Sequence, residues 1–161
     1  MRWVVGLASV LVVAVSCGRS AGAPGEQGCP AIGTPVGVSL TIPPEAVAGI
    51  SVAKLEACWN GQCVTRDVDL QPATAAAQTT CSTGGVCSAQ MTSTGGLHGF
   101  ADVPGLPAQP VRVTVVFDDG KPHSVEVTPS FTQPGGPGCE PAGPQAQLVV
   151  AADHKLLARQ R

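Results

Sequence analysis

The sequence predicts an all-β protein, specifically an antiparallel β-sandwich of immunoglobulin-like architecture with about seven strands. Three observations predict it. From Cys29 onward, short runs of β-branched residues alternate with Gly, Pro, Asn and Asp. No run in this part shows the apolar periodicity of an amphipathic helix. The 161 residues also include 20 Gly and 15 Pro, which suit turns. The length fits one domain, which we place at residues 29–161.

The strongest local signal is a β-hairpin at Asn60 and Gly61. These residues separate two runs of β-forming residues, and Asn-Gly is the preferred pair for a two-residue type I′ turn. The turn fixes a register in which Cys58 directly faces Cys63, within reach of a disulfide. One face of this hairpin is then polar and the other is apolar, with Arg66 as an unexplained member of the apolar face.

A second hairpin is expected at the sequence Asp-Asp-Gly of residues 118–120. A two-residue turn there would place Val113 opposite Glu126 and mix the two faces. A three-residue loop with Gly120 in the left-handed conformation instead pairs Val113 with Val125. We therefore prefer the second register, and we interpret the two acidic residues as turn-forming.

The remaining elements are weaker predictions. The β-branched run before Pro43 and two later runs are expected to be strands, whereas the Ala-rich segment 71–80 is expected to be a loop, with a short helix as the alternative. The tail after Val150 either adds an edge strand or frays. The expected strands are 36–42, 88–94 and 145–151.

Residues 1–16 have the features of a lipoprotein signal peptide. Arg2 is their single charge, and the apolar or small run at 3–15 is shorter than the roughly 20 residues that span a membrane. The sequence A-V-S-C that ends at Cys17 resembles the bacterial lipobox, so Cys17 is expected to carry diacylglycerol. An ordinary secreted protein is the alternative, because the small residues of this motif also suit general signal peptidase. Residues 17–28 are then the lipidated Cys and a flexible tether.

The seven cysteines divide into one and six under this interpretation. With Cys17 lipidated, an even number remains for disulfides in an oxidising compartment. The chain has three Phe, two Trp and no Tyr, so its core is built from small side chains and benefits from covalent links. The expected bridges are Cys58–Cys63 from the hairpin register, Cys81–Cys87 from proximity and Cys29–Cys139 by elimination.

Several segments together resemble a family of small actinobacterial surface lipoproteins. They are the lipobox, C-P-A-I-G-T-P-V-G-V, the hairpin C-W-N-G-Q-C, G-G-L-H-G-F-A-D-V-P-G-L-P and G-P-G-C-E-P. The resemblance covers nearly the whole mature chain and implies a lipid-anchored surface location with a sandwich similar to immunoglobulin and fibronectin-III modules. The family has no assigned activity, so it implies no catalytic residue.

Candidate contact residues are few. His98 lies in G-G-L-H-G-F, where neighbouring glycines would let a ligand approach the ring, although a structural or simply exposed His is the plainer interpretation. His123 is expected to be a packed or rim residue of a strand, and His154 to face solvent. Trp59 either anchors a partner or caps the end of the sandwich over Leu55.

Composition and motifs favour a protein that binds rather than catalyses. A net charge of −2 with 12% charged residues argues against nucleic-acid binding, and we expect no cofactor and no metal. The leading hypothesis is a non-enzymatic binding or structural module, anchored by lipid to the outer side of the cell membrane and contacting an unknown protein or cell-wall polymer. The alternative is a metal- or small-ligand-binding accessory lipoprotein that uses His98 and adjacent loops. A hydrolase whose catalytic residues come from distant segments is the third.

Overall fold

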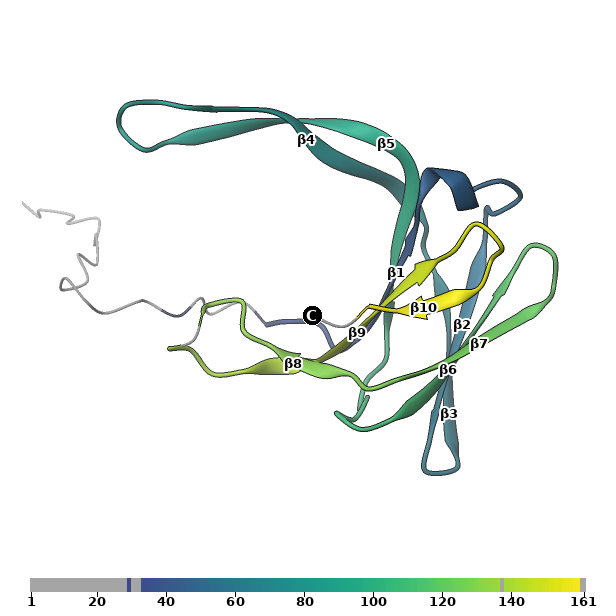
Figure 1. The fold of residues 1–161 in the computed structure, drawn as a ribbon. Helices are drawn as coiled ribbons and strands as arrows, with labels where there is room; N and C mark the ends of the chain where they lie inside the picture. The colour runs from purple at the N-terminus through teal and green to yellow at the C-terminus, as the bar shows by residue number, and fades with distance from the viewer. Residues whose placement is uncertain (1–28, 30–32, 137, 160–161) are drawn as a thin grey trace, which may run out of the picture.

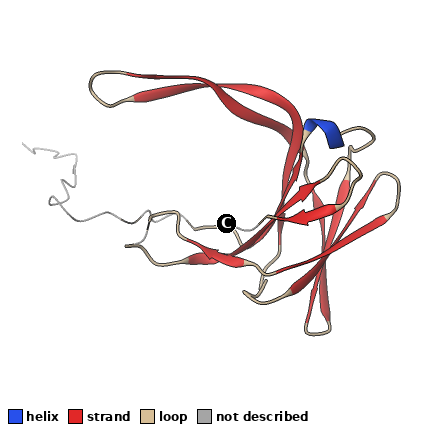
Figure 2. Ribbon diagram, viewed as in Figure 1, coloured by secondary structure: helices blue, strands red, loops and turns tan. Residues whose placement is uncertain are grey.

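A computed structural model describes residues 29, 33–136 and 138–159, and it shows an all-β sandwich (Figures 1 and 2). In this part of the chain, ten strands form two sheets, and the 3-10 helix η1 (Pro44–Ala46) precedes the second strand. The described residues include no helix that is long and apolar enough to cross a membrane. The predicted signal peptide, the lipobox with Cys17 and the tether lie outside the described residues.

The larger sheet contains six strands, and all but one of its strand pairs are antiparallel. The exception is the parallel pair formed by β1 (Gly37–Ile42) and β9 (Ala142–Val150), because parallel strands cannot be joined by a tight turn and these two are far apart in the sequence. The short strand β8 (Ser130–Thr132) also pairs with β9, outside the linear order of the other five strands. That order is β10 (Leu156–Ala158), β9 (Ala142–Val150), β1 (Gly37–Ile42), β5 (Cys87–Asp102) and β4 (Gln71–Cys81), with β8 at Ser130–Thr132.

The smaller sheet contains both predicted hairpins in the predicted registers. Cys58 faces Cys63, and the turn residues Asn60 and Gly61 have φ angles of 49° and 75°, as a type I′ turn requires. In the second hairpin Val113 faces Val125, and Gly120 is left-handed with φ 70°. The strand order is β3 (Gln62–Val68), β2 (Ala53–Trp59), β6 (Val111–Phe117) and β7 (Pro122–Val127).

The core lies between the two sheets and consists mostly of Val, Leu and Ala. Alternate residues of the central strands are fully buried, as the period of two predicts for strands with one covered face. Phe117 is the one Phe of this buried cluster. The largest fully buried side chains of the strands include Leu40, Ile42, Leu55, Leu148, Val113 and Val115.

Residues 71–80 form a strand, so the prediction of a loop is wrong. They belong to β4, which pairs along its length with β5, and the intervening loop is closed by the Cys81–Cys87 disulfide. Ala and Thr alone do not specify a strand strongly, and here the partner strand decides the conformation. The tail likewise forms an edge strand, β10, on β9. Together with the short strand β8, these additional strands raise the count from about seven to ten.

Three disulfides join the pairs that the sequence predicts. The bridge between Cys29 and Cys139 links residues 110 positions apart, with a Cα–Cα distance of 5.5 Å, and ties the segment before β1 to the loop before β9. The other two bridges close hairpins, and their Cα–Cα distances are 4.1 Å and 4.0 Å. The long bridge therefore connects distant segments, whereas the short ones hold local turns.

The distal part of the β4–β5 hairpin leaves the sandwich and forms an extended arm (upper left in Figure 1). We call residues 74–95 the arm, and every one of them is exposed. At its base Gly95 has a left-handed φ of 79°, and the next residue, Gly96, is buried so closely against Ile42 that a Cβ would lie 2.6 Å from the Ile42 carbonyl oxygen. Two adjacent glycines thus allow the strand to bend where the arm begins.

Candidate functional site

The uncovered face of the larger sheet carries a row of side chains that crosses five strands. We call this the outer-face row. Register pairs join its members strand by strand, and the core-facing residues alternate with them, so all five side chains lie on the side away from the core. The row consists of Gln71, His98, Thr41, Val149 and Leu157.

The chemistry of the outer-face row changes from one end to the other. Gln71 and His98 are exposed and offer an amide and an imidazole, and half-buried Thr41 adds a hydroxyl. Val149 is half-buried and Leu157 is 53% exposed, so this end is apolar. The row can therefore donate and accept hydrogen bonds at one end and bury apolar surface at the other.

A second row runs beside the first through Phe100, Ser39 and Gln147. The Phe100 ring is half-buried and lies over Gly37, where an added Cβ would come within 2.9 Å of two ring atoms. A side chain at position 37 would therefore clash with the Phe100 ring and with the Ala101 carbonyl oxygen. The two rows together place one aromatic ring among amide and hydroxyl groups.

Gln71 and His98, at the polar end of the outer-face row, lie in a part of the chain without charged residues. From Leu70 to Ala101 the sequence contains no Asp, Glu, Lys or Arg. This stretch includes β4 and nearly all of β5, with the arm between them. Because the exposed groups here are neutral, they match an uncharged polar partner better than an anionic polymer or an acidic surface.

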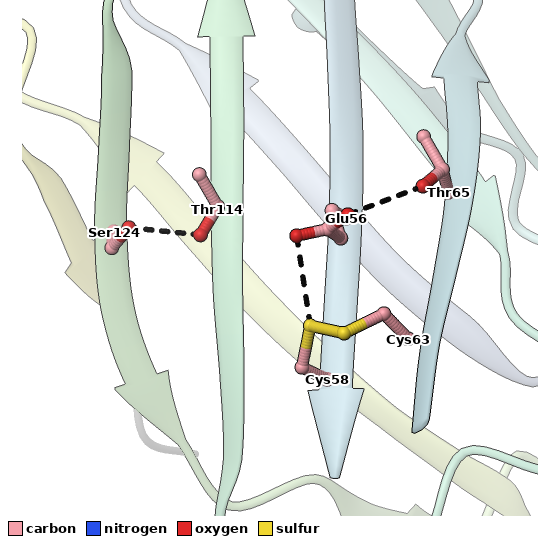
Figure 3. Close-up of a disulfide and its surroundings, with 6 residues drawn as sticks. All are labelled: Glu56, Cys58, Cys63, Thr65, Thr114 and Ser124. Atoms are coloured by element: carbon pink, nitrogen blue, oxygen red, sulfur yellow. Dashed lines mark hydrogen bonds between the residues drawn. A yellow bond between two sulfur atoms is a disulfide. The ribbon is translucent and has the colours of Figure 1, made fainter. Parts of the chain in front are cut away.

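His98 is exposed on the outer face, which agrees with the plainer interpretation of this residue. Among the described residues, the one group of three side chains close enough to hold a metal ion is Glu56, Cys58 and Cys63. Its two sulfur atoms are joined in a disulfide (Figure 3), and thiolates are the ligands that metals require from cysteine. His98 therefore belongs to no group of three metal-ligating side chains among the described residues.

The polar face around this disulfide follows the predicted register. Glu56 faces Thr65 across β2 and β3, and the Thr65 hydroxyl donates to the Glu56 carboxylate at 3.4 Å. On the neighbouring hairpin, the hydroxyls of Thr114 and Ser124 are 2.8 Å apart (Figure 3). These contacts are cross-strand pairs on the outer face of the smaller sheet, and they stabilise the sheet without forming a site.

Arg66 lies on a strand that the sequence places against the core, yet it is exposed. Its guanidinium Nε donates to the carbonyl oxygen of Asp102 at 3.0 Å, and Nη1 donates to the Thr65 carbonyl at 2.8 Å. The side chain therefore ties the edge of the smaller sheet to the end of β5. This contact explains a charged residue at an otherwise apolar face position.

Trp59 is half-buried and packs against the core cluster at the end of its hairpin. This position agrees with the interpretation of Trp59 as a cap on the sandwich. A fully exposed ring would have favoured a role as a contact anchor.

His154 is half-buried, so the expectation that it faces solvent is wrong. The turn before β10 folds back towards β7, and the three rings of Phe117, His123 and His154 lie with centroids 5.6–6.3 Å apart. His123 is a packed strand residue, as predicted, and its Nε2 atom is buried without a hydrogen-bond partner. The ring cluster joins the edges of the two sheets.

Asp118 has a structural role that the sequence does not reveal. Its carboxylate accepts hydrogen bonds from the Ser51 hydroxyl, the Ser51 backbone N–H and the Val52 N–H, and these bonds lower the pKa of Asp118 to about 2. Ser51 and Asp118 are 67 residues apart, so no local pattern could have indicated the contact.

A hollow of about 350 Å³ lies between β7, β8, β9 and the C-terminal segment. Its wall contains Glu126 and Arg159, and also the polar residues Thr128, Ser130 and Gln145. His98 does not line this hollow. In comparisons with protein-family models, with curated proteins and with solved structures, nothing matched this chain.

Proposed function

We propose that the protein is an extracytoplasmic lipoprotein that binds a partner without catalysing a reaction. In this proposal Cys17 carries the lipid, and the outer face of the larger sheet contacts a protein or a cell-wall polymer outside the membrane. The lipobox-like sequence at Cys17 supports the anchor. Three disulfides in a small domain support an oxidising compartment.

The observation that carries the binding proposal is the outer-face row. A sheet face normally has a covering layer or charged side chains that keep it solvated. The outer-face row instead presents uncharged hydrogen-bonding groups at Gln71, His98 and Thr41, next to the apolar Val149 and Leu157. Such a mixture is typical of a surface that is partly desolvated by a partner.

The alternative, a metal- or small-ligand-binding role for His98, has less support. No described group of three metal-ligating side chains includes His98. Metal sites in proteins need several ligands that converge on one point. The binding of a larger, uncharged partner requires only the exposed groups that the outer-face row supplies.

The anchor is tested by following where the protein is found in cells. The wild-type protein is expected in the membrane fraction, with diacylglycerol on Cys17 detected by mass spectrometry of the mature N-terminus. Cys17→Ala is expected to move the protein to the medium or to leave its precursor unprocessed. An unmodified Cys17 in a membrane-associated wild-type protein contradicts the anchor.

The binding face is tested by photocrosslinking on intact cells. A photoreactive amino acid at position 98 reports on the outer face of the larger sheet, and the same group at position 56 is the control on the smaller sheet. Crosslinks to one partner are expected from position 98 and not from position 56. Equal yields at both positions, or none at position 98, contradict the proposed face.

A further inference from the structure

The disulfide of the β2–β3 hairpin has a carboxylate beside it. Oε1 of Glu56 lies 3.6 Å from Sγ of Cys58 (Figure 3). A carboxylate oxygen of Glu56 and the sulfur atoms of Cys58 and Cys63 all lie within 4.8 Å of one another. While the S–S bond is intact, neither sulfur can act as a thiolate ligand. Opening this bond would therefore place two thiolates and one carboxylate around a common point.

The carboxylate is already oriented towards the two sulfur atoms. The Thr65 hydroxyl donates to Oε2 of Glu56 at 3.4 Å, so Oε1 is the oxygen that lies near the sulfur of Cys58. In metal sites, outer hydrogen bonds of this kind hold ligating carboxylates in position. Glu56 and Cys63 are exposed and Cys58 is half-buried, so both an ion and a reductant can approach from solvent.

The hairpin has contacts that keep its two cysteines together without the bridge. Cys58 and Cys63 face each other in register with a Cα–Cα distance of 4.1 Å, on either side of the type I′ turn. The other side of β2 pairs with β6 from Ala53 to Cys58. Two thiolates on one tetrahedral Zn²⁺ lie roughly 4 Å apart, a separation that facing residues of paired strands can supply.

The charges around the bridge favour thiolates and a bound cation. Arg112 of β6 faces Cys58 across the strand pair, and its side chain is exposed on the same face of the sheet. A cation beside a cysteine favours the thiolate over the thiol. Two thiolates and the carboxylate of Glu56 would carry three negative charges against the one positive charge of Arg112, which attracts a divalent cation.

We propose that Cys58, Cys63 and Glu56 form a Zn²⁺ site that is open only while the Cys58–Cys63 disulfide is reduced. A thiol reductant supplies two electrons and two protons and is oxidised to its own disulfide, so that the S–S bond breaks and two thiols form. Zn²⁺ then displaces one proton from each thiol and binds the two sulfurs and a Glu56 oxygen, with water as the fourth ligand. The metal ion and the disulfide therefore exclude each other.

The arm contains a matched bridge that lacks the carboxylate. Cys81 and Cys87 also face each other across a hairpin, with a Cα–Cα distance of 4.0 Å. The sequence from Leu70 to Ala101 contains no Asp or Glu, and no described group of three metal-ligating side chains includes this bridge. The arm bridge is thus an internal control for the response to a metal ion.

The test measures how Zn²⁺ changes the redox equilibrium of each bridge. The full-length Cys17→Ala variant, which keeps only the six bridged cysteines, is equilibrated in a glutathione redox buffer whose free Zn²⁺ is fixed by a chelator. Thiols are trapped by alkylation, and peptide mass spectrometry gives the reduced fraction of each bridge. At free Zn²⁺ of about 100 times its dissociation constant, the reduced-to-oxidised ratio of Cys58–Cys63 is expected to rise about 100-fold. The shift of Cys81–Cys87 is expected to be at least about tenfold smaller.

Substitution of the carboxylate separates a three-ligand site from two thiols that bind Zn²⁺ alone. Glu56→Gln is expected to decrease the Zn²⁺-dependent shift of the Cys58–Cys63 bridge by about tenfold or more. Asp67→Asn is the matched control, because Asp67 is an exposed carboxylate of the same hairpin outside the group of three. It is expected to leave the shift unchanged. Circular dichroism of the same samples establishes that the chain is folded.

A second variant avoids the reductant and so leaves the other two bridges in place. Cys58→His combined with Cys63→His supplies two imidazoles at the same facing positions, and imidazoles bind Zn²⁺ without reduction. This variant is expected to bind Zn²⁺ in calorimetric titration. Adding Glu56→Gln is expected to raise its dissociation constant by about tenfold or more. The position of the carboxylate is therefore tested even if complete reduction unfolds the chain.

Four results would overturn the proposal. The first is a Cys58–Cys63 equilibrium that does not respond to Zn²⁺, and the second is an equal response of the arm bridge. The third is an equal effect of Glu56→Gln and Asp67→Asn. The fourth is a histidine variant whose Zn²⁺ affinity is absent or does not depend on Glu56.

Discussion

The Asp118 carboxylate accepts hydrogen bonds from the Ser51 hydroxyl at 2.6 Å and from the Ser51 backbone N–H at 2.7 Å. Ser51 lies two residues before β2, and Asp118 comes directly after β6, so this contact closes one end of the β2–β6 pair. A third bond, from the Val52 N–H at 3.0 Å, completes the arrangement. One turn residue thus satisfies two backbone donors of a distant loop.

Asp118→Asn is expected to lower the free energy of unfolding at neutral pH. It is also expected to make this free energy depend less steeply on pH below about pH 4. The hydrogen bonds favour the charged form and hold the pKa of Asp118 at about 2, below the usual value near 4. The stabilisation is therefore complete above about pH 4 and is lost as the pH falls towards 2. Urea unfolding at a series of pH values measures this.

Asp67→Asn is the control for this prediction, because Asp67 is also an exposed aspartate of the smaller sheet. It is expected to leave the acid dependence close to that of the wild type. If Asp118→Asn and wild type lose stability in parallel between pH 4 and pH 2, the hydrogen bonds to Ser51 do not stabilise the fold.

Removing the long disulfide is expected to destabilise the domain more than removing a short one. Replacing Cys29 and Cys139 with Ala frees a loop spanning 110 positions, and chain entropy predicts a loss of about 4–5 kcal/mol. Replacing Cys81 and Cys87 with Ala opens a separation of 6 at the tip of the arm, for which the same relation gives about 2 kcal/mol. Denaturant titration measures both, and equal losses contradict the entropic account.

Gly99→Ala is expected to destabilise the fold by about 1–3 kcal/mol, because its site has no room for a methyl group. A Cβ there would lie 2.5 Å from Val68 Cγ1 and 2.9 Å from the Asp69 carbonyl oxygen, which is backbone and cannot rotate away. Val68 and Asp69 lie where the chain crosses from β3 of the smaller sheet to β4 of the larger sheet, whereas Gly99 belongs to β5 of the larger sheet. The clash would therefore push the two sheets apart.

Gly84→Ala is the matched control for Gly99→Ala. In the loop at the tip of the arm, its added Cβ would meet only the Ser82 hydroxyl, at 3.8 Å. Its melting temperature is expected to equal that of the wild type. A similar loss in both variants would mean that the close approach at Gly99 does not limit packing.

The hairpin registers were predictable from the sequence because they depend on neighbours in the chain. Asn60-Gly61 and the loop that ends at Gly120 each have a backbone requirement that few residue pairs satisfy, and strand alternation then selects one register. The same reasoning extends to Cys58–Cys63, since the register places these residues opposite each other.

The arm and the outer-face row were not predictable in the same way. Ala and Thr in residues 71–80 have no strong preference, and the strand exists because residues 87–102 pair with it. The row combines five strands, including a parallel pair and an edge strand whose positions depend on long-range contacts. The sequence identified His98 as a member, yet its neighbours Thr41 and Gln71 carry no signal of their own.

Trp59→Ala is expected to lower the free energy of unfolding by about 1–3 kcal/mol without weakening the crosslinks formed from position 98. The ring is half-buried against the core cluster, so its removal exposes apolar surface and leaves a gap at the end of the sandwich. Trp59→Phe keeps an aromatic ring there and is expected to retain most of the stability. Loss of the crosslinked partner at an unchanged melting temperature would instead make Trp59 a contact residue.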